Sequence, residues 1–395
     1  MIYLRLPVGS AHGWGICGKN LLRQLARLTE VRHVADPYPV EAVGDPLEHR
    51  LLAALRIAPE QVPGRLSAPA LHAIGGTSMT ADPRLHGEPN VGYTFFENEL
   101  PDDVATVAGE HFDLVVAGSS WCEKRLRERG CERVRTVLQG IDPRIFHPIP
   151  CEERPFPDQF VVFSGGKFEL RKGQDLVIKA VAVLQKRHRD VLLAAAWHNP
   201  WDFSLATMAA SPHLDFDPSG SQEEAIRRAV ADGGLDPERV IRLGTLPNAL
   251  MAQVYGATDV GLFPNRCEGG TNLVLMEYMA CGKPVIASYT SGHKDVLTAE
   301  NALRIETLSP IMIKGPQGVV ARWEEPCPEE TVAHLEWAYQ HRDELRCLGQ
   351  RAAADMGKLT WRRTAEQFLE LLEPTNHRSS PATSANTAGQ SPSAG

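Results

Sequence analysis

Short apolar segments alternate with amphipathic ones along the first third of the chain. Residues 2–8 (IYLRLPV) are mostly apolar and predict a buried strand, and a glycine-rich stretch, 9–18, leads into a helix expected to begin near Ile16. Further strands are predicted at residues 31–35, 90–95 and 113–117, and a further helix at 120–129. Such alternation is typical of a parallel sheet whose strands are joined by helices.

The same alternation begins again after a proline-rich segment. Residues 139–159 contain five prolines and no hydrophobic period, which predicts a linker with a domain boundary near residue 150. Beyond it the pattern predicts strands at 160–166, 191–197, 259–264 and 284–288 and helices at 174–187, 271–281 and 361–372. The second half is therefore expected to be another parallel α/β domain. Residues 374–395 are rich in Ser, Thr, Ala and Pro without an aromatic residue, and they predict a disordered tail.

Composition and charge narrow the possible functions. A chain of 395 residues with 43% apolar content can fill two cores, and a net charge of −8 disfavours nucleic acid as the main partner. The eight cysteines are scattered, without a C-x-x-C pair or histidines at zinc-ligand spacing, so we expect reduced thiols and no metal site. No apolar run approaches a membrane span, and the amino terminus lacks the pattern of a secretory signal. We expect a soluble, cytoplasmic protein.

The glycine-rich stretch offers a first candidate site. Gly13, Gly15 and Gly18 satisfy G-x-G-x-x-G between a strand and a helix, and Asp36 follows the next predicted strand. This pattern allows an NAD(P)-dependent oxidoreductase. However, the glycines begin several residues after the strand ends, which leaves a longer loop than a pyrophosphate cradle requires. The alternatives are a helix-entry loop that lets a ligand approach the backbone, and close packing of the helix on the sheet.

Charged residues of the second half form a stronger candidate. Lys167 and Lys172 follow one predicted strand, and Glu268 and Glu277 flank the loop after another. Because loops at the carboxyl ends of parallel strands meet at one crevice, these four charges are expected to converge. Two cations and two carboxylates suit a sugar diphosphate.

The helix that follows Glu268 adds backbone donors to this site. The N–H groups of Gly270, Thr271 and Asn272 open the helix and would bind the same anion at the positive end of its dipole. Glu277 lies on that helix among residues that are apolar on every side, so its carboxylate is expected to be buried and to need a partner. A ribose diol and an ion pair with a nearby Arg or Lys are both open.

Two further features have a functional and a structural interpretation. Residues 123–135 carry six basic and three acidic side chains, which fit either a weak contact with a membrane surface or anionic acceptor, or a solvated, salt-bridged face; the interspersed acids favour the second. His12 and His293 lie in loops where a ligand could meet them, although each is more typical of a hydrogen-bonded loop residue.

From residue 1 to about 372, the chain resembles the retaining GT-B enzymes of glycosyltransferase family 4. The segments FDLVVAGSSWCEKRLRERG and VRTVLQGIDPRIFHP resemble the end of the family's first domain, and SGGKFELRKGQDLVIKAV the start of its donor domain. RLGTLPNALMAQVYGATDVGLFPNRCEGGTNLVLMEYMACGKPVIAS resembles its donor-site signature, and LTWRRTAEQFLELL its final helix. The order and spacing of these segments together make the resemblance specific.

The resemblance implies a GT-B fold, in which two Rossmann-like, doubly wound parallel-sheet domains face a central cleft. Residues 1–150 would form the acceptor-side domain and 151–357 the nucleotide-sugar donor domain. The helix at 358–373 would cross back and pack on the first domain, and the tail 374–395 would take no part.

The resemblance also implies roles for single residues of the donor domain. Lys172 would bind the donor diphosphate, and Lys167 stands where the family usually has an arginine, which keeps the charge but loses the bidentate geometry. Glu268 would lie near the hydroxyls of the transferred sugar and Glu277 on the nucleotide ribose. The donor-binding loop between them is Gly269, Gly270, Thr271 and Asn272; eight residues separate the two glutamates where the family usually has seven.

In the first domain, the resemblance places Gly13 and Gly15 where acceptor and diphosphate come close to the backbone. Many relatives have a histidine near the reaction centre after a middle strand of this domain. This chain has GYTFFENELP there, so Glu97 or Asn98 would occupy that place.

The function implied is a retaining, hexosyltransferase-type transfer of a sugar from a nucleotide diphosphate to an acceptor hydroxyl. Lys167, Lys172 and the helix amides would stabilise the leaving diphosphate, so neither a metal nor a cofactor is expected. The acceptor is a saccharide, a lipid-linked compound or a small molecule, reached in the cytoplasm or at the inner membrane face. A GT-B sugar-nucleotide epimerase or hydrolase would share the donor site and stays an alternative beside the oxidoreductase.

Overall fold

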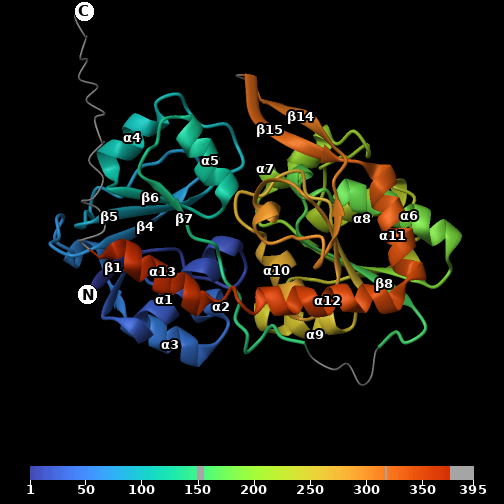
Figure 1. Ribbon diagram of the computed structural model, residues 1–395, viewed down its shortest axis with the longest axis horizontal. Coiled ribbons are helices and arrows are strands. Elements are labelled where there is room, and N and C mark those ends of the chain that lie inside the picture. Colours follow the sequence, from blue (N-terminus) through green and yellow to red (C-terminus); the bar gives the residue numbers. More distant parts are fainter. Residues whose placement is uncertain (149–154, 316–317, 374–395) are drawn as a thin grey trace, which may run out of the picture.

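The structure is a computed structural model and describes residues 1–148, 155–315 and 318–373. The chain forms two parallel sheets that lie beside each other, each covered by helices (Figure 1). This arrangement confirms the predicted GT-B architecture of two doubly wound α/β domains. The predicted disordered tail, 374–395, lies outside the described residues.

The first domain is built on a seven-stranded sheet with the order β3-β2-β1-β4-β5-β6-β7, in which every pair is parallel. Its strands are β1 (Ile2–Arg5), β2 (Val31–Val34), β3 (Arg56–Ile57), β4 (Ala70–Gly75), β5 (Asn90–Phe95), β6 (Leu114–Ala117) and β7 (Val134–Thr136). Its helices are α1 (Gly13–Leu28), α2 (Val40–Val43), α3 (Pro46–Ala54), α4 (Val104–His111) and α5 (Ser120–Glu128), with a short 3-10 turn at Pro59–Gln61. Helices α1 and α3 lie on one face and α4 and α5 on the other (Figure 1).

The second domain has a six-stranded parallel sheet with the order β10-β9-β8-β11-β12-β13. Its strands are β8 (Phe160–Lys167), β9 (Val191–His198), β10 (Val240–Arg242), β11 (Val260–Phe263), β12 (Val285–Ser288) and β13 (Leu303–Ile305). Its helices are α6 (Gln174–Arg187), α7 (Asp202–Leu205), α8 (Gln222–Asp232), α9 (Met251–Gly256), α10 (Leu273–Ala280), α11 (Pro328–Gln340) and α12 (Arg342–Met356), with 3-10 turns η2 (Leu170–Lys172) and η6 (Ser291–Asp295) among its loops. Burial on both faces explains why these strands are nearly continuous apolar runs in the sequence.

The last helix, α13 (Trp361–Leu372), lies on the first domain. It packs along α1 in Figure 1, and Phe368 and Leu372 join the same buried cluster as Leu21 and Leu25 of α1. The chain reaches it beside the linker, because the Ile141 N–H donates to the Leu359 carbonyl at 2.9 Å and the Trp361 N–H to the Ile141 carbonyl at 3.2 Å. Both crossings between the domains therefore run side by side.

Helix α1 begins earlier than the sequence pattern predicts. It starts at Gly13 and not near Ile16, because the His12 side chain caps it: Nδ1 accepts a hydrogen bond from the Gly15 N–H at 3.0 Å. Histidine is not among the residues that usually cap helices, so the rule for helix starts gave no signal here. Strand β1 also ends early, at Arg5, before Pro7, which has no N–H to give to a sheet ladder.

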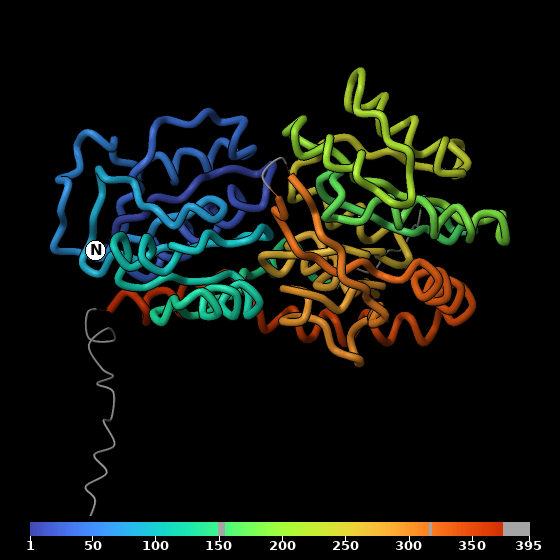
Figure 2. The backbone as a smooth tube through the Cα atoms, turned by 90° about the horizontal axis from the view of Figure 1, so that it is seen from above, coloured from blue at the N-terminus to red at the C-terminus, as the bar shows by residue number. Residues whose placement is uncertain are grey.

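An antiparallel hairpin of the second domain has no counterpart in the predicted elements. Strands β14 (Leu308–Gly315) and β15 (Gly318–Pro326) form it, and it reaches from the second domain toward the first (Figures 1 and 2). The Glu99 N–H donates to the Val320 carbonyl at 2.9 Å, and the Trp323 indole N–H donates to the Glu97 carbonyl at 2.8 Å. The hairpin thus holds the loop after β5 against the second domain.

Candidate active site

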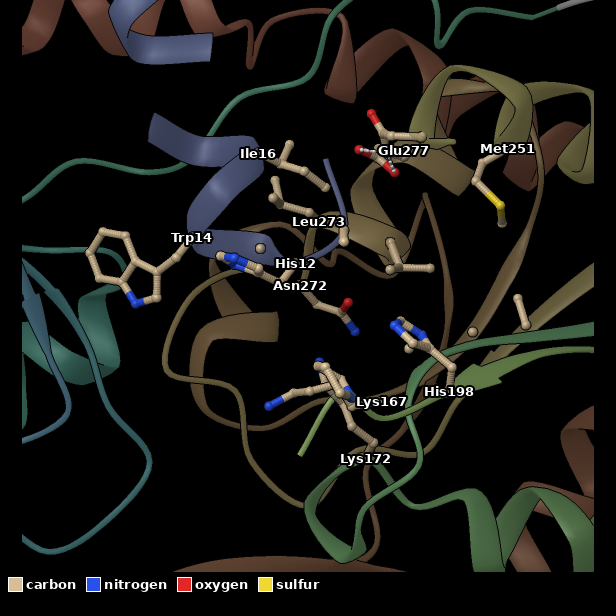
Figure 3. A pocket seen from close by; sticks show the side chains of 18 of the residues that line it. His12, Trp14, Ile16, Lys167, Lys172, His198, Met251, Asn272, Leu273 and Glu277 are labelled. Carbon is tan, nitrogen blue, oxygen red and sulfur yellow. Dashed lines mark hydrogen bonds between the residues drawn. The ribbon is translucent and has the colours of Figure 1, made fainter. Parts of the chain in front are cut away.

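A cavity of about 350 Å³ lies between the two domains, where the carboxyl ends of their strands face each other. The first domain lines it with residues from the loop after β1, the start of α1, the end of β5 with the loop that follows, and the segment after β7: Ser10, Ala11, His12, Gly13, Trp14, Ile16, Phe95, Glu97 and Gln139. The second domain contributes residues that follow β8, β9, β10 and β11, among them Lys167, Arg171, Lys172, His198, Trp201, Asn248, Glu268, Gly270, Asn272 and Glu277. The two lysines and the two glutamates that were predicted to converge all line this cavity (Figure 3).

At the centre of the second-domain wall, Glu268 is held by two cations. Its Oε1 lies 2.6 Å from the Lys172 Nζ, and its Oε2 lies 3.0 Å from a guanidinium nitrogen of Arg171. The Asn265 amide donates to the same carboxylate. Burial opposes ionisation of Glu268, but the Lys172 ammonium and the Arg171 guanidinium outweigh it and hold the pKa near 2. Glu268 is therefore a carboxylate at neutral pH.

Arg171 is a cavity residue that the sequence analysis missed. The residue is 9% exposed, and its guanidinium lies 2.7 Å from Glu169 and 3.3 Å from Glu97 of the first domain, in addition to its contact with Glu268. The segment ELRKG offers two adjacent cations, and only the path of the 3-10 turn η2 turns both toward the cavity. Sequence alone gave no signal to separate an inward Arg171 from a solvated one.

Lys167 stands at the end of β8 and lines the cavity with a side chain that is 31% exposed. Its Nζ lies 3.3 Å from a Glu169 carboxylate oxygen and 4.9 Å from the centre of the Trp201 ring. Unlike Lys172, it does not contact Glu268 in the pairs of described residues. Lys167 therefore presents its ammonium at the mouth of the cavity, between a carboxylate and an aromatic face.

Glu277 lies on α10 at another side of the cavity and is held by neutral groups. The Asn248 amide donates to both carboxylate oxygens, at 3.0 and 3.1 Å, and the Tyr255 hydroxyl is 3.5 Å away. No ion pair with Glu277 exists among the described residues, so the expected alternative of an Arg or Lys partner is wrong for that part of the chain. Burial raises the pKa of Glu277 to about 8, and the bonds from Asn248 and Tyr255 offset only part of that effect.

This raised pKa predicts an unusual pH dependence of stability. The ordinary pKa is 4.5, so protonated Glu277 stabilises the folded chain fully below that pH, and the contribution is lost as the pH rises through about 8. We expect Glu277→Gln, which is neutral throughout, to become more stable than the parent protein between pH 5 and 9, by on the order of 3–5 kcal/mol. Thermal unfolding of the ligand-free proteins at several pH values measures the difference. The matched control is Glu366→Gln at an exposed ion pair, and a parallel pH profile for both variants would contradict the prediction.

In the loop between Glu268 and Glu277, some residues line the cavity and others make packing contacts. Gly270 and Asn272 line the cavity, whereas Gly269 and Thr271, also predicted to bind the donor, are not among its lining residues. The Gly269 carbonyl accepts from the Ser119 hydroxyl at 2.7 Å, and a side chain at this position would meet the Phe96 backbone at 2.5 Å. Gly269 thus permits a close approach of the two domains. The Thr271 hydroxyl is directed at the Met276 sulfur, 2.9 Å away.

The glycines of the first domain are divided in the same way. A side chain at Gly13 would meet no atom within 4 Å, so its Cα faces the open cavity. A side chain at Gly15 would lie 2.9 Å from the Gly9 backbone, and one at Gly18 would lie 2.0 Å from the Pro7 carbonyl oxygen. Gly15 and Gly18 therefore serve the close packing of α1, one of the alternatives that the motif left open, and no observation favours a nicotinamide site.

Of the two candidates for the position after β5, Glu97 lines the cavity, and Asn98 is exposed and is not among the lining residues. The Glu97 carboxylate accepts from the Gly269 N–H at 3.3 Å and pairs with Arg171. A first-domain carboxylate is therefore held in the cavity by second-domain atoms.

His293 and the basic segment 123–135 make structural contacts, whereas His12 both caps α1 and lines the cavity. His293 is buried, with Nδ1 3.0 Å from the Ser288 carbonyl and Nε2 3.2 Å from the Asn272 amide, and burial lowers its pKa to about 4. In the segment 123–135, Arg125 pairs with Glu99 at 3.0 Å and Arg127 with Glu123 at 2.8 Å. These contacts make a salt-bridged face.

No group of three or more His, Cys, Asp or Glu side chains is arranged to hold a metal ion in residues 1–148, 155–315 and 318–373. In the same part of the chain, no helix is both long and apolar enough to cross a membrane.

Residues 159–312, which hold every second-domain residue that lines the cavity, match the family described as glycosyl transferases group 1. The second domain is therefore similar to group 1 glycosyltransferases, and the whole chain has the GT-B fold. Solved structures agree with this fold. A sucrose-phosphate synthase from Thermosynechococcus elongatus superposes with a TM-score of 0.63 at 18% identity over 94% of this chain and 97% of its own. Anabaena HepE in complex with UDP and glucose superposes with a TM-score of 0.61 at 14% identity, over 94% and 98%.

Two curated proteins illustrate the similarity over a longer part of the chain. The D-inositol 3-phosphate glycosyltransferase of Segniliparus rotundus is 24% identical over 289 residues, which cover 70% of this chain and 56% of that protein. The GDP-mannose-dependent alpha-(1-6)-phosphatidylinositol dimannoside mannosyltransferase of Mycobacterium tuberculosis is 24% identical over 267 residues, 66% of this chain and 58% of that protein. The matches thus span somewhat more than half the length of these relatives.

Proposed function

We propose that this glycosyltransferase moves a sugar, of the hexose type, from a nucleotide diphosphate to an acceptor hydroxyl with retention of the anomeric configuration. The observation that carries the proposal is the buried Lys172–Glu268 pair in a cavity that both domains line. The names of related proteins support a nucleotide-sugar donor: one is GDP-mannose-dependent, and HepE was solved with UDP-glucose.

The cations of the cavity suit the leaving group of this reaction. As the bond between the anomeric carbon and the donor phosphate oxygen breaks, negative charge grows on the diphosphate. Lys172 and Lys167 are positioned before the reaction begins and would stabilise that charge, together with Arg171, without a metal ion. Neither a metal nor a cofactor is part of the proposal.

The two glutamates would hold the donor. Glu268 is ionised and shares its oxygens with two cations, so a sugar hydroxyl that donates to it joins an already charged network. Glu277 would take the ribose hydroxyls in place of, or beside, the Asn248 amide. The acceptor oxygen would form its bond to the anomeric carbon on the face that the diphosphate leaves, and its proton would pass to the leaving phosphate oxygen. No enzymic nucleophile is needed in this sequence.

The direct test is thermal unfolding with UDP, GDP, ADP, their sugar conjugates and NAD, each at about 100 times its dissociation constant. Binding at that ratio stabilises the folded state by about 2.7 kcal/mol, which raises the Tm by a few degrees. We expect one nucleoside diphosphate and its sugars to raise the Tm, with full effect after dialysis against EDTA. A response to NAD alone would contradict the proposal.

Product analysis then separates transfer from the reactions that would share the donor site. Proton NMR of the product reports its anomeric configuration and hence retention. Conversion of the donor without any acceptor would instead indicate an epimerase or a hydrolase.

A further inference from the structure

The two walls of the cavity differ in charge. All three cations that line it, Lys167, Arg171 and Lys172, belong to the second domain. The first-domain wall consists of aromatic, aliphatic and neutral polar residues with a single carboxylate, Glu97, and no Lys or Arg occurs among the described residues that line that wall. A phosphate group bound on the first-domain side would therefore meet no cationic side chain of this wall.

The nearest first-domain cations are already committed. Lys19 donates to the Ser10 hydroxyl at 3.0 Å and pairs with Glu48 at 3.1 Å. Arg23 pairs with the same Glu48 at 3.1 Å and with Asp142 at 2.6 Å. Neither side chain lines the cavity. Redirecting one of them toward an acceptor phosphate would break an ion pair that is largely buried.

His12 also brings no positive charge to this wall. Its Nδ1 accepts the hydrogen bond from the Gly15 N–H, which leaves the ring proton of the neutral form on Nε2. Burial, and then the charge of Lys167, lower the pKa of His12, so the ring is neutral at pH 7 and acts as a hydrogen-bond donor.

The most prominent feature of the first-domain wall is an aromatic cluster. The ring centres of Trp14 and Phe95 are 4.6 Å apart at 71°, and both contact Tyr93, which is fully buried. The Phe95 ring in turn packs closely against Gly118 and Gly270, because a Cβ atom at either glycine would overlap it. Edge-to-face packing of this kind gives a rigid apolar surface.

Trp14 offers a polar group at the edge of that surface. It is half-buried, and its indole N–H has no hydrogen-bond partner in the part of the chain that the structure describes. Figure 3 shows Trp14 on the opposite side of the cavity from Glu277, Met251 and His198, with Lys167 and Lys172 below the space between them. The cationic wall suits the donor diphosphate, so the Trp14 side of the cavity is left for the acceptor.

We propose that the acceptor is an uncharged molecule with a ring that has an apolar face, bound by Trp14 and Phe95, and that a phosphorylated acceptor is disfavoured. This inference rests on the proposed transfer function and adds the substrate class of its acceptor. An indole face packs on the C–H face of a sugar or cyclitol ring, and the indole N–H donates to one of its hydroxyls. Acceptors of this class differ from the inositol 3-phosphate that appears in the name of the Segniliparus relative.

Matched pairs of small probes test the class directly. The pairs are myo-inositol with inositol 3-phosphate and glucose with glucose 6-phosphate, and phenyl β-D-glucoside tests whether an aromatic ring is preferred to a sugar ring. Saturation-transfer NMR measures their binding to the protein loaded with the nucleoside diphosphate that stabilises it most. We expect each neutral member to bind at least about tenfold more tightly than its phosphorylated partner. Tighter binding of a phosphorylated member, or no binding of any neutral member, overturns the proposal.

A variant series assigns the effect to the aromatic wall. Trp14→Ala is expected to weaken the neutral probes about tenfold and Trp14→Phe to restore part of the affinity, while the affinity for the nucleoside diphosphate changes less than about threefold. Trp337→Ala is the matched control, because Trp337 stacks on His341 in the second domain, away from the cavity. Unchanged probe binding in Trp14→Ala contradicts the inference alone, whereas absence of nucleotide binding in the parent protein contradicts the proposed function.

Discussion

Replacing Lys172 by alanine is expected to lower kcat by about 10²–10³ while the KM for the acceptor changes little. The ammonium lies 2.6 Å from Glu268 and is the most buried lysine charge of the cavity, so it stabilises the leaving diphosphate in a site with little water to substitute for it. Removing one preorganised group that stabilises a developing negative charge costs an amount of this size. Initial rates at varied donor and acceptor concentrations measure the effect.

Controls separate this loss from a disturbed fold. Glu268 keeps its contact with Arg171 in the variant, so we expect Lys172→Ala to unfold within a few degrees of the parent protein. Lys186→Ala removes an exposed lysine near the end of α6 and should leave the rate unchanged. Lys172→Arg should retain more activity than Lys172→Ala. A kcat within threefold of the parent value in Lys172→Ala would remove Lys172 from the proposed mechanism.

Replacing Arg266 by alanine is expected to lower the free energy of unfolding by about 3–5 kcal/mol. Its side chain is fully buried, pairs with Asp175 at 2.7 Å and with Glu325 of β15 at 2.5 Å, and also donates to the Leu170 carbonyl. The variant leaves two carboxylates without their cation, and one of them, Asp175, is itself fully buried. Denaturant unfolding at pH 7 measures the loss.

The control for Arg266 is an arginine of the same domain at the surface. Arg187 pairs with Glu336 at 3.0 Å but is 52% exposed, so Arg187→Ala should cost less than about 1 kcal/mol. Because Asp175 and Glu325 are acidic, we also expect Arg266→Ala to recover part of its stability as the pH falls toward the range where carboxylates protonate. Equal losses in the two variants would show that burial of the Arg266 pair contributes nothing beyond a surface ion pair.

Much of the fold follows from hydrophobic period and strand order. The helices at 174–187 and 361–372 and the strand at 90–95 have the bounds that the pattern predicts. Each helix has one apolar stripe, and nearly every residue of the strand is buried. The hairpin at 308–326 was not predicted. Its residues alternate between half-buried and exposed, and only Ala321, Trp323 and Pro326 of β15 are well buried, so the pattern lacks the contrast of a core strand.

The sequence predicted which charged residues gather at the candidate site, but not which other residues line it. Parallel strands bring Lys167, Lys172, Glu268 and Glu277 to one edge because their loops must meet there. Arg171, Asn248 and Trp14 were missed, since their roles depend on the direction in which a side chain leaves a turn or the first turn of a helix. The roles of the single glycines likewise depend on close contacts, of Gly15 with Gly9 and Gly18 with Pro7 inside the first domain and of Gly269 with Phe96 between the domains, which a sequence does not display.

The paired crossings between the domains have a mechanical consequence. Hydrogen bonds join the two interdomain segments at Ile141, Leu359 and Trp361, and Gly140 leaves no room for a side chain between them. The two segments therefore bend together about one line but resist twisting. Rotation about that line separates most the atoms that lie farthest from it. Figure 1 places the β14–β15 hairpin at the opposite end of the domain boundary from the junction of α12 and α13. The hydrogen bond between Glu99 and Val320 therefore lies far from this line. When the domains rotate apart, its length increases more than that of contacts nearer the line.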